Sequence, residues 1–385
     1  MKIDRHLSVA LHKILNKYPI IALTGPRQSG KTTLLKSLLA DYEYVSLENP
    51  DNRYFADNDP NGFLLRYSSK VIIDEAQRVP HLFSYLQTKV DDSGEMGQYV
   101  LSGSQNFHLM KEITQSLAGR VALFKLFPFD FREMKNGNIL NENFLYYLIQ
   151  GFYPAIYDRG IEANTYYKNY VQTYIQRDVS ELIGIKNQNV FKRYLALLAT
   201  RAGHLLNLNE MARKIGISQP TAKSWLSALE NSYIVFTLQP YFENFSKRIV
   251  KTPKLYFYDT GLLAYLLKIN GLENLDLHPL KGNLFENMII AEYVKQNYHS
   301  DQSIDFWFWR DSNGNEIDLL FNTGEKLCII EIKSSMTIKP DHFKGLNNFE
   351  KNATNKKLIK QLVYAGSENQ QRQDGKVISW QDSGV

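Results

Sequence analysis

The fold of this chain follows from nine residues near its start, Gly25-Pro26-Arg27-Gln28-Ser29-Gly30-Lys31-Thr32-Thr33. They match the pattern G-x-x-x-x-G-K-[ST], in which a glycine-rich turn joins a strand to a helix. The flanking sequence supplies both elements, because residues 18–23 form an apolar run typical of a buried strand and residues 32–40 have a helical pattern. The stretch therefore predicts a phosphate-binding loop.

The residue types of this loop suit a nucleoside triphosphate. Gly25 and Gly30 allow the backbone to turn its N–H groups towards phosphate oxygens, and the helix that begins near Gly30 adds the positive end of its dipole. We expect Lys31 to reach the β- and γ-phosphates and Thr32 to bind Mg²⁺. The alternative is a purely structural turn, which would not require the adjoining Lys-Thr pair.

The composition is that of a globular chain. It has 385 residues, 44% apolar and 22% charged, and no apolar run approaches the roughly 18 residues of a membrane span. The length predicts about two to four domains. The first residues lack the apolar core of a signal peptide, so we expect a cytoplasmic protein. One cysteine, Cys328, excludes an internal disulfide, and a net charge of +5 permits a polyanionic partner without requiring one.

Two carboxylates follow a second buried strand. Residues 70–73 are mostly apolar and lead directly into Asp74 and Glu75. A nucleotide hydrolase needs a metal ligand and a base at this place, so we expect Asp74 to hold Mg²⁺ through water and Glu75 to activate the attacking water. The alternative is that both acids cap the next helix. A further predicted strand, 44–47, is typical of the P-loop proteins in which an extra strand separates the two motifs.

Four more residues are candidates for contacts with the γ-phosphate or its attacking water. Ser104 and Gln105 follow a predicted strand at the edge where open parallel sheets bind ligands, although they could equally form a turn that closes the strand. Arg120 and Arg27 are candidates for an arginine that stabilises charge in the transition state. Arg120 could instead be an exposed arginine at a helix end, and the sequence does not distinguish action within a subunit from action across a boundary.

Four motifs together carry a family resemblance. They are residues 23–32, Ile73-Asp74-Glu75-Ala76-Gln77, Leu101-Ser102-Gly103-Ser104 and Leu117-Ala118-Gly119-Arg120. In these motifs the chain resembles a family of prokaryotic AAA-type ATPases whose members carry an uncharacterised C-terminal domain, and the resemblance covers nearly the whole chain. It implies ATP rather than GTP as the nucleotide and an α/β/α sandwich as the fold of the core.

The middle of the chain is predicted to contain a helical lid and a winged helix. Residues 136–205 are helical and rich in aromatic residues, which favour a packed core over stacking on bases. Residues 206–270 show two helices separated at Gly216, then strands at 233–236 and 255–258. The second of these helices offers only Lys223 as a cation, which is little for binding phosphates.

The predicted wing is richer in positive charge. Four cations could follow a phosphate backbone, although a winged helix alone does not establish DNA binding and an architectural or protein-binding role stays open. These residues are Lys247, Arg248, Lys251 and Lys254.

The segment 275–385 carries a second chemical pattern. Glu286 lies in the apolar stripe of a predicted helix, where a carboxylate requires a partner. Asp318 follows a predicted turn, and Glu331 and Lys333 share one face of a predicted strand. The predicted elements that complete this domain are helices at 341–350 and 356–359 and strands at 361–364 and 377–380.

These four residues match the restriction-endonuclease-like PD-(D/E)XK pattern, except that Ile317 stands where a proline is usual. Asp318 and Glu331 would hold Mg²⁺ against a phosphodiester, Lys333 would stabilise the attacking water or the developing charge, and Glu286 would complete the metal shell. The alternative is an exposed hairpin with alternating charges. Such a domain can also bind without cleaving.

The sequence thus predicts an α/β protein: a P-loop NTPase α/β/α sandwich (1–135), a helical lid (136–205), a winged helix (206–270) and a C-terminal α/β restriction-endonuclease-like domain (275–385). We expect an ATPase that uses Mg²⁺ and acts as a switch for a nuclease-like, DNA-associated module. The rivals are an ATP-gated, Mg²⁺-dependent DNA nuclease and a regulatory ATPase whose C-terminal domain only binds protein or nucleic acid. A protein partner or a homo-oligomer is compatible with each, and no membrane is expected.

Overall fold

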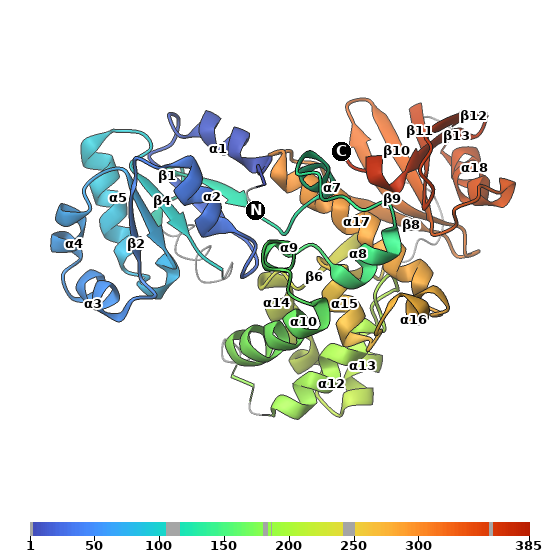
Figure 1. The fold of residues 1–385 in the computed structure, drawn as a ribbon, viewed down its shortest axis with the longest axis horizontal. Helices are drawn as coiled ribbons and strands as arrows, with labels where there is room; N and C mark the ends of the chain where they lie inside the picture. Colours follow the sequence, from blue (N-terminus) through green and yellow to red (C-terminus); the bar gives the residue numbers. More distant parts are fainter. Residues whose placement is uncertain (1–2, 105–115, 180–183, 186, 242–250, 354–356) are drawn as a thin grey trace.

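The computed structural model of the chain describes residues 3–104, 116–179, 184–185, 187–241, 251–353 and 357–385. Three of the predicted site residues, Gln105, Lys247 and Arg248, lie outside these ranges. The chain runs from one sheet, through a group of helices, to a second sheet (Figure 1). Among the described helices, none has both the length and the apolar character that crossing a bilayer requires.

The first sheet is parallel and has the strand order β2-β3-β4-β1-β5. Its strands are β1 (Ile20–Thr24), β2 (Glu43–Ser46), β3 (Val71–Asp74), β4 (Tyr99–Ser102) and β5 (Val121–Lys125). Because β4 lies between β1 and β3, the strand of the phosphate loop and the strand of the acidic motif are not neighbours. The strand predicted at 44–47 is present as β2, but it lies at the edge of the sheet beside β3 and is not the strand that separates the two motifs. Both strands still end at the same edge of the sheet, which brings their motifs together.

Helices cover both faces of this sheet. They are α1 (Leu7–Ile14), α2 (Lys31–Leu38), α3 (Pro50–Asn58), α4 (Pro60–Arg66) and α5 (Leu82–Ser93), with a short 3₁₀ turn η1 (Ala76–Arg78). Side chains of β1 alternate between two apolar clusters. Ile20 and Ala22 pack with α3, α4 and α5, whereas Ile21 and Leu23 pack with α1 and α2. The three layers of the predicted α/β/α core are therefore present.

The middle of the chain is helical. Its elements are α7 (Phe131–Asn136), α8 (Phe144–Gln150), α9 (Pro154–Arg159), α10 (Ala163–Tyr170), the π-helix η2 (Val171–Val179), α12 (Gln188–Ala199), α15 (Thr260–Leu266) and α16 (Leu272–Asp276). The aromatic residues of this region are buried, among them Tyr147, Tyr153, Tyr167 and Tyr170. Full burial of such side chains contributes about 1.5–3 kcal/mol each. They belong to the core, as predicted, and are not a surface for stacking on bases.

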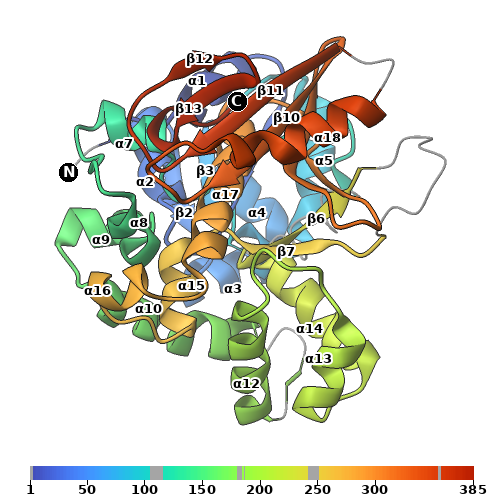
Figure 2. The ribbon, with the colours of Figure 1, turned by 90° about the vertical axis from the view of Figure 1, so that its right-hand side faces the viewer.

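Two helices and a hairpin follow the predicted pattern of residues 206–270. They are α13 (Leu208–Ile215), α14 (Gln219–Asn231), β6 (Val235–Pro240) and β7 (Lys254–Phe257). Gly216 ends α13 with a φ of 79°, and the Ser218 side chain accepts the Thr221 N–H at 3.2 Å to cap α14. The hairpin is continuous with the C-terminal sheet, because β6 also pairs with β8 of that sheet. Figure 2 shows β6 and β7 next to α13 and α14.

The C-terminal half contains a sheet with the order β12-β13-β11-β10-β9-β8-β6-β7. Its further elements are α17 (Lys281–His299), β8 (Trp307–Arg310), β9 (Glu316–Thr323), β10 (Lys326–Lys333), η3 (Pro340–Phe343), α18 (Lys344–Asn352), β11 (Lys357–Tyr364), β12 (Gln370–Arg372), β13 (Gly375–Ser379) and η4 (Trp380–Asp382). One expectation is wrong. Residues 357–359 begin β11 instead of a helix, because they pair in register with residues 326–328 of β10.

Helix α17 lies between the two sheets (Figure 1) and is buried along most of its length. Its apolar residues, including Phe285 and Ile289, pack in the same cluster as Phe308, Leu319 and Ile330 of the C-terminal sheet. On the other face of this sheet, α18 packs against Trp309 and Ile317. The C-terminal sheet is thus covered on both faces, and its acidic residues lie in a largely buried setting.

Candidate functional site

The phosphate loop opens into a cavity of about 1090 Å³, a size suited to a nucleotide. The cavity lies between the loop, the first described residues of the chain and α9. Most of the nucleotide-site residues that the sequence singled out line it, among them Arg27, Lys31, Thr32, Asp74, Glu75 and Ser104.

The loop has the backbone conformation that its glycines permit. Gly25 has a φ of 142°, and a Cβ there would lie 2.1 Å from the Leu126 carbonyl oxygen, so no larger residue fits. Lys31 Nζ donates to the carbonyl oxygens of Gly25 and Pro26, each at 2.9 Å. Burial lowers the pKa of Lys31 to about 8, against the attraction of Glu75 and Asp74. The ammonium therefore lies at the loop itself, where phosphates would contact it.

Asp74 is held by neutral donors. Its carboxylate accepts the Thr32 hydroxyl at 3.1 Å, the Tyr44 hydroxyl at 2.7 Å and the Ser102 hydroxyl. None of these three groups neutralises the negative charge, and Thr32 and Asp74 line the same cavity. A hydroxyl beside a carboxylate is the donor set that hydrated Mg²⁺ uses in P-loop proteins, so these residues fit that ion.

Tyr44 was not predicted as a site residue. It pairs in register with Ile72 of β3, two residues before Asp74, so its side chain and that of Asp74 share one face of the sheet. Only the register between β2 and β3 reveals this contact, and the sequence does not give that register.

Glu75 leaves the end of β3 in a left-handed conformation, with a φ of 55°. Burial raises the pKa of its carboxyl, which suits a general base, while the Lys31 charge opposes that shift. Gln77 Nε2 donates to Glu75 Oε2 at 2.6 Å, and the Ser104 hydroxyl lies 3.5 Å from the same oxygen. A Cβ at Gly103 would lie 2.3 Å from Gln77 Oε1, so that glycine leaves room for the amide. Gln77 belongs to the motif 73–77 but was not recognised as a site residue.

Arg120 does not lie at the nucleotide site of its own chain. Its carbonyl oxygen accepts the Ile20 N–H at the start of β1, whereas the phosphate loop follows the end of that strand. Its guanidinium pairs with Asp91 of α5 at 2.5 Å. The expectation that Arg120 contacts the nucleotide from within the chain is therefore wrong. Arg27 does line the cavity, and so does Arg159 of α9, which the sequence did not single out.

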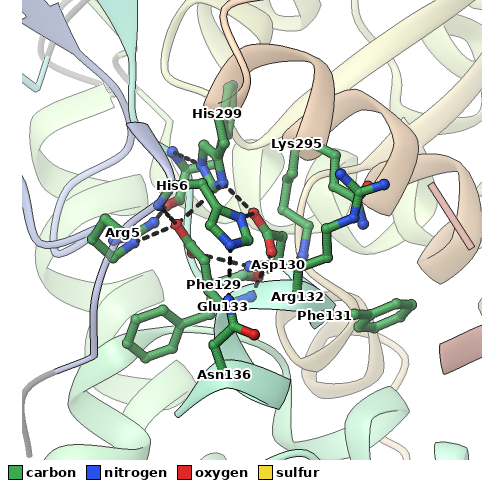
Figure 3. A network of polar contacts seen from close by, with 12 residues as sticks. Arg5, His6, Phe129, Asp130, Phe131, Arg132, Glu133, Asn136, Lys295 and His299 are labelled. Atoms are coloured by element: carbon green, nitrogen blue, oxygen red, sulfur yellow. Dashed lines mark hydrogen bonds and ion pairs between the residues drawn. The ribbon is translucent and has the colours of Figure 1, made fainter. Parts of the chain in front are cut away.

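Arg5 joins the phosphate loop to the end of the first domain. Figure 3 shows Arg5 close to Glu133. Its guanidinium donates to the Ser29 carbonyl oxygen at 2.8 Å and to the Phe127 carbonyl oxygen at 2.6 Å. It also pairs with Glu133 at 2.9 Å. The side chain is almost fully buried and had no motif around it that predicted this position.

His299, the last residue of α17, completes this network (Figure 3). Its Nδ1 lies 2.7 Å from Asp130 Oδ2, and its Nε2 accepts the Phe127 N–H at 3.1 Å. Because a backbone N–H can only donate, Nε2 is the acceptor of this bond and Nδ1 is the ring nitrogen that faces Asp130. The C-terminal half thus makes directed hydrogen bonds to the first domain.

His6, Asp130 and Glu133 place potential ligand atoms within 4.8 Å of one another, a grouping not repeated among the described His, Cys, Asp and Glu side chains. The two acids are already paired, since Arg5 contacts Glu133 and both histidines contact Asp130. The hydrogen bond that His6 donates to Asp130 raises the pKa of His6 despite burial. The group is a satisfied polar network and we assign no metal to it.

The C-terminal acids come together from α17, β9 and β10. Asp318 accepts the Ile332 N–H at 2.8 Å, and Lys333 pairs with Glu331. Burial and the neighbouring Asp318 raise the pKa of Glu331 to about 8 and also raise that of Glu286. We call Glu286, Glu316, Asp318 and Glu331 the acid cluster. In the described part of the chain, however, its ligand atoms do not converge as the atoms of the His6 group do.

Lys254 does not have the role predicted for it. Its side chain is 3% exposed and its ammonium contacts Glu286 Oε1 at 3.0 Å and the Glu316 carboxylate. A buried, paired lysine cannot follow the backbone of DNA, so this expectation is wrong. Lys251 is exposed, as the prediction of a basic wing requires.

Three family models match successive parts of the chain. An AAA domain matches residues 17–135, and two domains of unknown function, DUF8612 and DUF4143, match residues 141–273 and 281–382. With the parallel sheet and the phosphate loop, the AAA match defines the class of protein as a P-loop ATPase of the AAA type.

Sequence relatives define the family. The chain is 31% identical over 348 residues to the uncharacterized protein Rv2008c of Mycobacterium tuberculosis, an alignment that covers 88% of this chain and 75% of the relative. It is 25% identical over 366 residues to the uncharacterized protein MJ1544 of Methanocaldococcus jannaschii, covering 86% and 77%. The chain belongs to the same family as the mycobacterial protein.

Solved structures are more distant. The Walker-type ATPase PABY2304 of Pyrococcus abyssi has 16% identity and a TM-score of 0.44, with 69% of this chain and 96% of that chain covered. The RuvB Holliday junction branch migration motor of Thermotoga maritima has 16% identity and a TM-score of 0.31, with 60% and 86% covered.

Proposed function

We propose that the chain is an ATP-hydrolysing switch whose nucleotide state controls a C-terminal, nuclease-like module that associates with nucleic acid. One observation carries this proposal: α17 reaches from the acid cluster to the ATPase domain. Glu286, near the start of the helix, belongs to the acid cluster, whereas His299 bonds Asp130 and the backbone of Phe127. The helix between Glu286 and His299 is about 20 Å long.

The chemistry at the nucleotide site follows from the side chains that line its cavity. Lys31 binds the β- and γ-phosphates, and Glu75 takes a proton from the attacking water. Thr32 and Asp74 would hold Mg²⁺, which neutralises phosphate charge when it is bound. Gln77 and Ser104 hold the Glu75 carboxylate in place. Arg27 and Arg159 line the cavity as candidates for the cation that stabilises the transition state.

Arg5 supports a route from this chemistry to α17. It contacts the Ser29 carbonyl oxygen inside the loop and the Glu133 carboxylate of α7. Asp130, which caps α7, bonds His299. Loss of the γ-phosphate changes the charge at the loop and would displace the loop. Arg5 would pass this displacement of the loop to α7 and then to α17.

For the C-terminal half we propose a winged helix at 206–270 and a PD-(D/E)XK-like domain at 275–385. The proximity of Glu286, Asp318, Glu331 and Lys333 supports that domain type. Contact with nucleic acid through exposed Lys251, and a cytoplasmic location, stay predictions. Of the two rivals, the buried ion pairs of Lys254 favour a module that binds its partner over one that cleaves DNA.

Hydrogen exchange on the full chain tests the switch. We expect the amides of residues 290–299 to exchange at different rates with ADP and with a non-hydrolysable ATP analogue. The difference should shrink in Arg5→Gln while the nucleotide still binds, and it should persist in the control Arg372→Gln, which changes an exposed arginine. Equal exchange of α17 in both nucleotide states of the unaltered chain would contradict the proposal.

A further inference from the structure

We propose that Lys254 is the resident cation of the acid cluster and keeps divalent metal ions out of it. This inference rests on the proposed PD-(D/E)XK-like fold, and it concerns what that fold holds in place of Mg²⁺. The lysine comes from β7, the second strand of the hairpin that joins the middle of the chain to the C-terminal sheet.

The ammonium of Lys254 contacts one oxygen of the Glu286 carboxylate. Glu286 Oε1 accepts from Lys254 Nζ at 3.0 Å and from the Tyr256 hydroxyl at 2.6 Å. The same ammonium pairs with Glu316 and lies 5.6 Å from the centre of the Phe308 ring. A carboxylate oxygen with two close donors has little capacity left for a metal ion.

The position of Lys254 is fixed by the fold. Asn287, which is fully buried on α17, clamps β7 through both backbone groups of Phe257: its Oδ1 accepts the N–H and its Nδ2 donates to the carbonyl oxygen, each at 2.8 Å. Lys254 begins the same four-residue strand. Its side chain is therefore part of the packed interface and not a surface cation that happens to reach inward.

The charges of the region are also consistent with a lysine in the place of a metal. Four carboxylates face three cations, because Lys333 pairs with Glu331 and Arg310 pairs with Glu316 in addition to the Lys254 contacts. A divalent cation beside the Lys254 ammonium would turn this balance into an excess of positive charge at a largely buried place, which is costly.

The remaining carboxylate is enclosed by α18. Glu331 Oε2 is buried and has no hydrogen-bond partner, and a Cβ at Gly345 would lie 3.0 Å from it. The glycine lets the start of α18 approach the carboxylate closely. The three acids that a PD-(D/E)XK site would need therefore face different neighbours: Glu286 faces Lys254, Asp318 faces the Ile332 N–H, and Glu331 faces α18 and Lys333.

Binding of Mn²⁺ to the full chain without nucleotide, followed by electron paramagnetic resonance, tests the proposal. A C-terminal ion is recognised as one that Asp318→Asn removes and Asp74→Asn does not. We expect no such ion in the unaltered chain or in Lys254→Arg, which keeps the charge. We expect one equivalent in Lys254→Met, lost again in Lys254→Met/Asp318→Asn.

Two results would overturn the proposal: a C-terminal ion in the unaltered chain, or a folded Lys254→Met chain that binds none. If Lys254→Met is too unstable to purify, the unaltered chain and Lys254→Arg still decide the matter, because either can reveal an ion that coexists with the cation. Failure of the ATP switch would appear instead in nucleotide binding and in exchange of α17, which these measurements do not use.

Discussion

The nucleotide site and the acid cluster both combine lysines with carboxylates, yet the two sites use them in opposite ways. Asp74 is held by hydroxyls, so its charge stays available, and Lys31 contacts only carbonyl oxygens of its own loop. In the acid cluster, Glu286 and Glu331 are each paired with a lysine. Neutral donors orient a carboxylate without neutralising its charge. An ammonium orients the carboxylate and also neutralises it. We therefore expect the first site to receive Mg²⁺ and phosphates, and the second to exclude a metal ion.

The largest effect on the first site is expected for Glu75→Gln. Loss of the base should lower the rate of ATP hydrolysis by about 10²–10⁴-fold while ATP still binds, because phosphate contacts are unaffected. Steady-state phosphate release and calorimetry measure the two quantities, with exposed Glu95→Gln as the control. Since burial raises the pKa of Glu75, activity should decline on acidification at a higher pH than for an ordinary glutamate. Unchanged hydrolysis in Glu75→Gln would remove this residue from the mechanism.

The lysines of the two sites should affect stability in opposite directions. Lys254→Met leaves buried carboxylates unpaired and should cost about 3–5 kcal/mol. Lys31→Met removes a charge whose burial is only partly compensated, so the nucleotide-free chain should melt at a higher temperature. Thermal melting monitored by circular dichroism measures both changes.

The pH dependence of melting gives a second test of this contrast. Lys31 has its folded pKa lowered to about 8 from 10.5, so between these values the unfolded chain binds more protons and stability rises with pH. That gain should be absent in Lys31→Met. If both lysine variants shifted the melting temperature in the same direction, the contrast between the sites would be wrong.

Affinity for ATP should fall by about 100-fold in Lys31→Ala, because a charge-assisted contact with the phosphates is lost. Exposed Lys17→Ala is the matched control and should bind as the unaltered chain does. Calorimetry with ATP and Mg²⁺ measures both. Equal affinities for the two variants would show that the loop does not bind phosphate as proposed.

The smallest effect is expected for Arg120→Ala. Its guanidinium pairs with Asp91 away from the phosphate loop, so ATP affinity should change by about twofold or less. A loss of hydrolysis that depends on protein concentration would reveal action in the site of another copy. A tenfold loss of ATP affinity in monomeric Arg120→Ala would contradict the position of Arg120 away from the phosphate loop.

Local motifs made the nucleotide site predictable. Each of the two motifs, residues 25–33 and the pair Asp74 and Glu75, consists of adjacent residues whose types predict its chemistry. The parallel strands that precede the motifs end at the same edge of the sheet and so bring the motifs together. Tyr44, Arg5 and Arg159 could not be predicted, because they reach the site through strand register or from other segments. Arg120 was misplaced because a residue before a strand lies at the opposite edge of the sheet from the residues after one.

In the C-terminal half, a different factor limited what could be predicted from the sequence. The positions of Glu286, Asp318, Glu331 and Lys333 followed from helix and strand periodicity. The position of Lys254 could not be predicted, because the basic stretch around it does not indicate which lysine turns inward. That choice depends on the Asn287 clamp of β7 to α17, a contact between segments about 30 residues apart.

The number of Mn²⁺ ions bound per chain in the presence of a non-hydrolysable ATP analogue tests the central contrast most directly. We predict one ion, which disappears in Thr32→Ala and Asp74→Asn and persists in Asp318→Asn. Two ions, one of them sensitive to Asp318→Asn, would contradict the closed acid cluster. An absence of any ion sensitive to Asp74→Asn would contradict the open nucleotide site.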